Sequence, residues 1–253
     1  MLENLPVVHD PWFYAAALPA AFLIGLSKSG FASGFGALAT PLLALTVPVP
    51  QAAAILLPVL LVADGFGLRH LWRQCDFALL RLLLPPALAG IVAGALLFGV
   101  FSSAAVAGVT GALTLAFLAQ RLLFPPRPDR PGMPRWVGRL CALASGFTSF
   151  VAHAGSPPVN AYVLPLGLAP SVFAGTMSVF FAVLNASKWL PYALIGTIDL
   201  RNMLTSALLL PLPPLGVMAG VWLTKRIRPV WFYRIAYTGM GLTGCKLLWE
   251  GLR

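Results

Sequence analysis

The chain has 253 residues, of which 59% are hydrophobic and only 9% are charged, and its formal net charge is +10. Soluble domains carry about 25% charged residues, so this composition excludes an ordinary soluble protein. Because the basic residues lie in short loops between apolar segments, they indicate the cytoplasmic side of a membrane protein rather than a nucleic-acid partner.

Five apolar segments make up the first half of the chain. At about 20 residues per membrane crossing, the full length allows about seven to ten spans. We therefore expect an all-α, polytopic integral membrane protein, with Lys28-Ser29-Gly30 separating the first two segments so that residues 12–47 form one broken segment. The helices expected in this half cover about 12–27, 31–47, 50–70, 79–98 and 104–123.

A Pro- and Arg-rich stretch follows at 124–137, and we interpret it as a cytoplasmic linker. The chain then divides into a first repeat over 1–123 and a second repeat over 138–253. Each repeat is expected to start with a broken segment, 12–47 or 138–168, followed by three helices. The segments expected in the second half cover about 138–154, 157–168, 171–195, 203–223 and 230–250.

Glycines keep a common order in the two halves, which indicates an internal duplication. Gly25 and Gly146 lie 121 residues apart, and Gly90 and Gly216 lie 126 residues apart. Two broken segments at equivalent places are typical of transporters built from two repeats, in which the substrate binds where the breaks meet.

Basic residues are distributed differently in the two repeats. The heavier load lies after the third segment in the first repeat, around 69–81, but one loop later in the second repeat, around 225–234. Under the positive-inside rule this shift favours inverted over parallel repeats, with the N-terminus outside. The limbs of the broken segments are short for crossing, which favours re-entrant hairpins, although two full crossings stay open.

Both breaks contain small residues and hydrogen-bond donors and contain no carboxylate. A helix that stops inside the bilayer leaves backbone groups unpaired, so such breaks occur where they line a cavity. The start of the following helix carries a partial positive charge, which favours an anion. The substrate-binding residues that we predict are Lys28, Ser29, Ser33, Gly34, Gly36, Thr40, Ser149, His153, Gly155, Ser156, Asn160 and Asn185.

Four ionisable residues fall inside or beside apolar segments, where such groups are costly and usually functional. Lys28 either attracts an anion or extends to the interface, and His153 either binds substrate, carries a proton or is structural. Asp64, which the repeat offset places opposite Leu184 or Asn185, either carries a proton or pairs with Arg69. Lys188 is either part of the site or interfacial. Asp64 and His153 are therefore the proton-coupling candidates.

Catalytic and metal-binding patterns are missing from the sequence. Cys75, Cys141 and Cys245 lie far apart and form no CxxC pair, and no nucleotide-binding or hydrolase motif occurs. We therefore expect no enzyme activity, no metal and no cofactor, and a transporter driven by a gradient. The alternative is a channel or permease for another small solute or cation, which would need an acidic or thiolate lining.

The chain resembles the TauE/SafE family over nearly its whole length. The resemblance lies in the glycine-rich segment that ends in Pro41-Leu42-Leu43, in its counterpart Ala154-Gly155-Ser156-Pro157-Pro158, and in the element at 196–199. It implies a transporter in the cytoplasmic (inner) membrane that exports sulfite, sulfoacetate or a related organosulfonate. Its partners would be this small anion and the lipid bilayer, and a homo-oligomer stays open.

Overall fold

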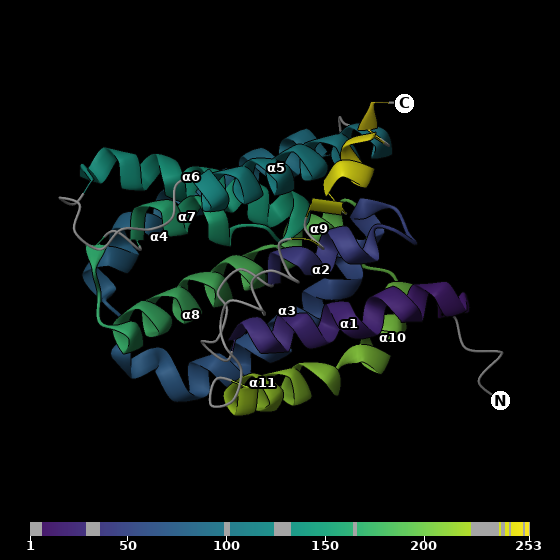
Figure 1. Ribbon diagram of the computed structural model, residues 1–253, viewed down its shortest axis with the longest axis horizontal. Helices are drawn as coiled ribbons and strands as arrows, with labels where there is room; N and C mark the ends of the chain where they lie inside the picture. The colour runs from purple at the N-terminus through teal and green to yellow at the C-terminus, as the bar shows by residue number, and fades with distance from the viewer. Residues whose placement is uncertain are drawn as a thin grey trace.

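The computed structural model describes residues 7–28, 36–98, 102–123, 133–163, 166–223, 238, 241–242, 244–249 and 251–252. Within these ranges the regular structure is helical, without a strand, as Figure 1 shows. The expected all-α class is therefore confirmed for the described part of the chain.

The helices of the first half follow the predicted segments closely. The second predicted segment, 31–47, contains the helix Gly36–Leu43, which ends four residues earlier than expected; residues 29–35 lie outside the described ranges. The elements are α1 (Pro11–Lys28), α2 (Gly36–Leu43), α3 (Val49–Leu71), the 3₁₀ turn η1 (Trp72–Gln74), α4 (Phe77–Phe98) and α5 (Ser103–Leu123).

The second half contains more helix ends than the sequence pattern predicts. The expected segment 171–195 divides at Lys188, because Pro191 lacks an N–H and its ring clashes with the carbonyl four residues earlier. The expected segment 203–223 divides at Leu210-Pro211 for a similar reason. The first helix of this half begins at Arg135, inside the expected linker 124–137. The elements are α6 (Arg135–Ala152), α7 (Ser156–Val163), α8 (Pro170–Ser187), α9 (Trp189–Leu194), α10 (Leu200–Leu209) and α11 (Leu212–Leu223).

The outer surface is suited to lipid. Three helical stretches are long and apolar enough to cross a membrane, namely Val49–Arg69, Phe77–Leu97 and Leu200–Ala219. Large apolar side chains such as Leu96 and Leu194 are more than two-thirds exposed. In water this exposure would create aggregation-prone hydrophobic patches, but in a bilayer it places the side chains against the lipid acyl chains.

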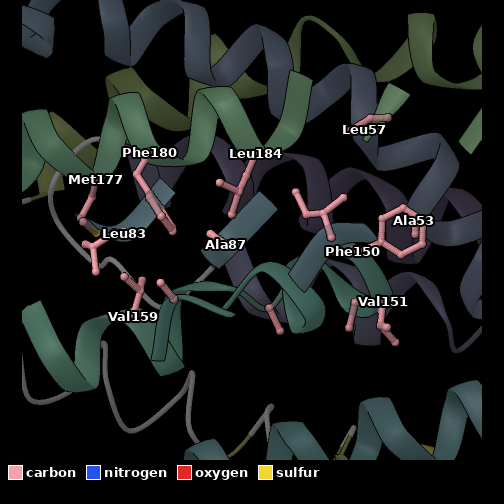
Figure 2. Close-up of a cluster of buried hydrophobic side chains, with 14 of the residues drawn as sticks. Ala53, Leu57, Leu83, Ala87, Phe150, Val151, Val159, Met177, Phe180 and Leu184 are labelled. Atoms are coloured by element: carbon pink, nitrogen blue, oxygen red, sulfur yellow. The ribbon is translucent and has the colours of Figure 1, made fainter. Parts of the chain in front are cut away.

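Helices α3 and α8 lie side by side near the centre, and they run in opposite directions. Asp64 of α3 is bonded to Asn185 near the end of α8, whereas Leu71, further along α3, lies against Gly175 near the start of α8. Around them, α1 packs on α11 and α4 packs on α6. A core of buried apolar side chains from α3, α4, α6 and α8 joins these helices (Figure 2); it includes Leu57, Leu83, Phe150, Phe180 and Leu184.

Glycines allow two of these helix pairs to approach until their backbones touch. A Cβ at Gly25 of α1 would overlap the carbonyl oxygen of Pro213 of α11, and a Cβ at Gly146 of α6 would overlap that of Ala87 of α4. Each pair therefore depends on the missing side chain, as in close helix contacts of other membrane proteins.

Candidate functional site

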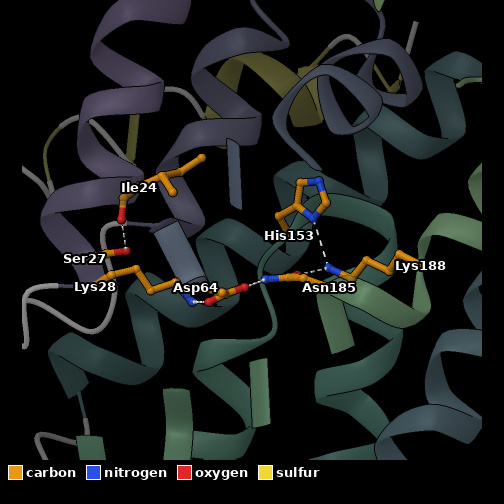
Figure 3. A network of polar contacts seen from close by, with 7 residues as sticks. All are labelled: Ile24, Ser27, Lys28, Asp64, His153, Asn185 and Lys188. Atoms are coloured by element: carbon orange, nitrogen blue, oxygen red, sulfur yellow. Dashed lines mark hydrogen bonds and ion pairs between the residues drawn. The ribbon is translucent and has the colours of Figure 1, made fainter. Parts of the chain in front are cut away.

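A continuous chain of polar side chains crosses the centre of the protein (Figure 3). The Lys28 ammonium forms an ion pair with the Asp64 carboxylate, and the Asn185 amide donates to the other Asp64 oxygen at 2.6 Å. The Lys188 ammonium then donates to the Asn185 side-chain oxygen at 2.8 Å and lies 3.0 Å from Nδ1 of His153. We call these five residues the polar chain.

Four different elements position the polar chain. Lys28 is the last residue of α1, and His153 directly follows the last residue of α6. Asp64 projects from α3, while Asn185 and Lys188 lie at the end of α8. The ends of α1 and α6, the two helices that precede the predicted breaks, thus meet at the α3–α8 pair.

The polar chain is almost completely withdrawn from the surface. Lys188 is 0% exposed, Asp64 1%, Asn185 3% and His153 8%, while the Lys28 side chain keeps 15% of its surface and lies over the ring of Phe181. Charges buried in this way are tolerated only when they are paired and hydrogen-bonded. The cost of burying them indicates a functional cluster.

The hydrogen-bond partners of His153 determine which of its ring nitrogens carries a hydrogen. Nε2 of the ring lies 2.8 Å from the carbonyl oxygen of Ala53, and because a carbonyl can only accept, Nε2 carries a hydrogen. Nδ1 then accepts from the Lys188 ammonium. The arrangement is that of a neutral imidazole held between a backbone carbonyl and a cation.

The polar chain carries more positive than negative charge. Two ammonium groups, on Lys28 and Lys188, face one carboxylate, on Asp64, and His153 is neutral in its bonding arrangement. Counted with both lysines protonated, the cluster has a formal charge of one positive unit inside the membrane region. Such an excess favours an anion over a cation as an additional ligand.

The break after α6 is built by hydroxyl groups that hold backbone carbonyls. His153 has a φ of 51°, the left-handed conformation that lets a helix end abruptly. The Ser145 hydroxyl donates to the carbonyl of Gly155 at 2.6 Å, and the Thr148 hydroxyl donates to the carbonyl of Ala154 at 2.9 Å. A Cβ at Gly155 would lie 2.7 Å from the Cβ of Ser149, so only glycine fits this turn.

Fewer backbone donors are available at this break than the sequence analysis supposed. Two of the first three residues of α7, Pro157 and Pro158, have no N–H. Ser156 begins the helix and is half-buried, and Asn160 follows within it. The positive charge near the second break therefore comes mainly from the Lys188 side chain rather than from the start of α7.

The remaining predicted residues are distributed around both breaks. Gly36 begins α2, where a Cβ would lie 3.0 Å from the Ser27 hydroxyl. Oγ1 of Thr40 on α2 and Oδ1 of Asn160 on α7 are buried without a hydrogen-bond partner in the described residues. Ser29, Ser33 and Gly34, also predicted as substrate ligands, lie outside the described residues.

The sequence left the partner of Asp64 and the role of Lys188 open. Asp64 pairs with Lys28, not with Arg69, because a residue five positions along a helix does not share its face. Lys188 was weighed between a site residue and an interfacial one, and the structure buries it beside His153. A clue in the sequence was Pro191, which ends α8 at the lysine.

Removing the hydroxyls that hold the second break should destabilise the protein without altering its charge. In Ser145→Ala and Thr148→Ala, the carbonyls of Gly155 and Ala154 lose their donors, and each loss should cost about 1–3 kcal/mol because the group stays buried. Denaturant titration of the purified protein in mixed micelles measures the effect. Ser187→Ala is the matched control, because the Ser187 hydroxyl donates to the Leu184 carbonyl within its own helix; a loss as large in that variant would contradict the proposed role.

Comparison with known proteins agrees with this architecture. The family model described as "Sulfite exporter TauE/SafE" matches residues 17–247, which is most of the chain. The comparisons with curated proteins and with solved structures returned no match. Together with the apolar helices, the family match shows an integral membrane protein of a transporter family. The chain therefore belongs to the TauE/SafE sulfite exporter family.

Proposed function

We propose that this protein is a secondary transporter that exports a small sulfur-containing anion, such as sulfite, sulfoacetate or a related organosulfonate, across the cytoplasmic membrane. The observation that carries the proposal is the excess of basic groups in the polar chain, in which one buried and one partly buried lysine face a single carboxylate. An anion that enters this cluster would neutralise a charge that is otherwise costly to bury.

The two lysines are the proposed ligands of the anion. Lys188 has three N–H groups and two acceptors, Asn185 and His153, which leaves one donor for a bound oxyanion. Lys28 has the most exposed side chain of the cluster. The unpartnered Thr40 hydroxyl, and Ser29, Ser33, Gly34 and Gly36 at the first break, would complete the site as hydrogen-bond donors.

Inverted repeats would account for the way the helices pair. If α3 corresponds to α8, their opposite directions require repeats that cross the membrane in opposite senses. Helix pairing is reciprocal as well: α1 of the first repeat packs on α11 of the second, and α6 of the second packs on α4 of the first. Exchange of equivalent contacts in this way is typical of two-fold symmetry.

The same pairing suggests which parts move during transport. Because α1 and α11 touch through their backbones, as do α4 and α6, each pair is expected to move as one body. We propose that alternating access displaces the α1–α11 body relative to the α4–α6 body, with α3 and α8 between them. Each moving body would then combine helices from both repeats, rather than one repeat moving against the other.

Anion flux in proteoliposomes tests the proposal. Proteoliposomes that contain the purified protein and are loaded with unlabelled anion should take up labelled sulfite or sulfoacetate in exchange. Lys188→Met should reduce the rate of this exchange at least about 100-fold, because a binding charge is lost where no water can replace it. Lys246→Met, which removes a charge from an exposed position, is the matched control and should exchange at the wild-type rate.

The same assay separates the transporter from the channel or cation permease. A transporter shows exchange that saturates and is accelerated by anion on the opposite side, whereas a channel gives flux that is not accelerated in this way. Flux of divalent metal ions with no flux of any anion would overturn the proposal.

A further inference from the structure

We propose that Asp64 carries a proton that is taken up with the substrate, so that a doubly charged anion binds together with one proton. This inference rests on the proposed anion transport and identifies its coupling group. Two groups were candidates on sequence grounds, Asp64 and His153, and their surroundings in the structure distinguish them.

Charge balance links the proton to the charge of the anion. The polar chain holds two ammonium groups and one carboxylate, so one monoanion makes it neutral while Asp64 stays ionised. A dianion would leave one excess negative charge in the same place. Protonation of Asp64 removes that excess, and the dianion then takes the place of the carboxylate beside Lys28.

His153 is poorly placed to do this. Its Nε2–H is bonded to the carbonyl of Ala53, and its Nδ1 accepts from Lys188. A second proton would have to enter at Nδ1, directly against an ammonium group 3.0 Å away. Protonating His153 would also add positive charge to the cluster without removing any negative charge.

Asp64 is surrounded by groups that favour exchange of its carboxylate with another anion. Lys28 from α1 and Asn185 from α8 bond Asp64 directly, and Lys188 and His153 follow behind Asn185 in the polar chain. Helices α2 and α11, which also pack on α3, carry no charged residue. Asp199 at the start of α10 lies near the opposite end of α3, where Asn202 bonds Gln51.

Small and polar residues lie along the α3–α8 contact between Asp64 and the loop before α4. Gly67 lies about one turn beyond Asp64 on α3, and a Cβ there would lie 2.8 Å from the Ser178 hydroxyl of α8. Oγ of Ser178 is buried without a partner among the described residues, which is the kind of group that a water molecule satisfies. Further along, the Thr176 hydroxyl accepts from the amide of Asp76 at 2.9 Å.

A proton that moves between the loop and Asp64 along this contact would not pass His153. Asp76 and Cys75 at its outer end are partly exposed, and toward its inner end the Ser178 hydroxyl packs directly against Gly67. Both ends of the route lie along the antiparallel contact of α3 with α8.

Counting the protons that accompany binding tests the inference. Sulfoacetate, a dianion at neutral pH, is added to purified protein in weakly buffered solution, and methanesulfonate serves as the monoanion. Wild-type protein should take up about one proton per sulfoacetate and none per methanesulfonate, and its Kd for sulfoacetate should weaken about tenfold per pH unit where Asp64 is ionised in the empty protein. In Asp64→Asn the uptake and the pH dependence should both disappear.

Two further variants keep the assignment falsifiable if Asp64→Asn folds poorly. Asp64→Glu keeps an ionisable group and should keep about one proton taken up per bound sulfoacetate. His153→Asn, in which asparagine tolerates the left-handed backbone, should keep the same ratio of protons to bound anion at a weaker Kd. Loss of uptake in His153→Asn, or no uptake by the wild type, would overturn the inference while leaving anion transport intact. Failure of the wild type to bind either anion would instead overturn the proposed function.

Discussion

Replacing Lys28 with methionine should lower the free energy of unfolding by about 3 kcal/mol. The substitution leaves the Asp64 carboxylate, which is 1% exposed, without its ion-pair partner, and a buried charge that loses one partner typically costs about 3–5 kcal/mol. The Asn185 amide remains at 2.6 Å, which places the expected loss at the lower end. Denaturant titration in mixed micelles, followed by tryptophan fluorescence, measures the change.

A double-mutant cycle should show that the loss belongs to the pair. Lys28→Met together with Asp64→Asn removes both charges, so the double variant should be less destabilised than the two single variants combined, by about 1–3 kcal/mol. Anion exchange should not recover in the double variant, because one of its two binding ammonium groups is missing. Losses that simply add would mean that Lys28 and Asp64 do not interact in the membrane.

Arg69→Met is the matched control for this cycle. It removes a positive charge from the same helix as Asp64, at an exposed position, and Arg69 is the partner that proximity in sequence suggested. Its effect on stability should stay within about 0.5 kcal/mol, as for other surface substitutions. A loss comparable with that of Lys28→Met would restore Arg69 as the partner of Asp64.

The helices were largely predictable because local patterns determine them. Apolar length and flanking Pro, Gly or charge placed α1, α3, α4 and α5 within two residues of their observed ends. The additional ends came from prolines inside apolar segments, whose effect depends on the tertiary surroundings. Thus α3 continues through Pro58, whereas α8 ends before Pro191.

Four of the five residues of the polar chain were among the predicted site residues, but the role of Lys188 and the connections between the five were not predictable. Glycine-rich breaks pointed to Lys28 and His153. The repeat offset placed Asp64 opposite Leu184 or Asn185, and the structure bonds it to Asn185. Nothing local indicates that Lys188 reaches His153, or that His153 bonds the carbonyl of Ala53. These contacts join residues 35 and 100 positions apart, and packing of whole helices determines them.

Substituting alanine for Gly146 should produce the other large effect, a loss of stability of about 3 kcal/mol or more. The new Cβ would overlap the carbonyl oxygen of Ala87, and because that atom belongs to the backbone of α4, the two helices must separate. Overpacking of a dense core costs about 1–3 kcal/mol even when side chains can move. Gly25→Ala should have a similar effect, because its Cβ would overlap the carbonyl oxygen of Pro213 on α11.

Gly65→Ala supplies the matched control, since a Cβ at that position of α3 has no neighbour within 4 Å. Alanine favours a helix over glycine by about 1 kcal/mol, so this variant should be as stable as the wild type or slightly more stable. Unfolding titrations of the three variants compare the two helix pairs directly. A similar loss in Gly25→Ala and Gly146→Ala, with none in Gly65→Ala, is the result expected if α1–α11 and α4–α6 are equivalent contacts. Wild-type stability in either variant would mean that the backbones of that pair do not touch, and the proposed moving bodies would lose their physical basis.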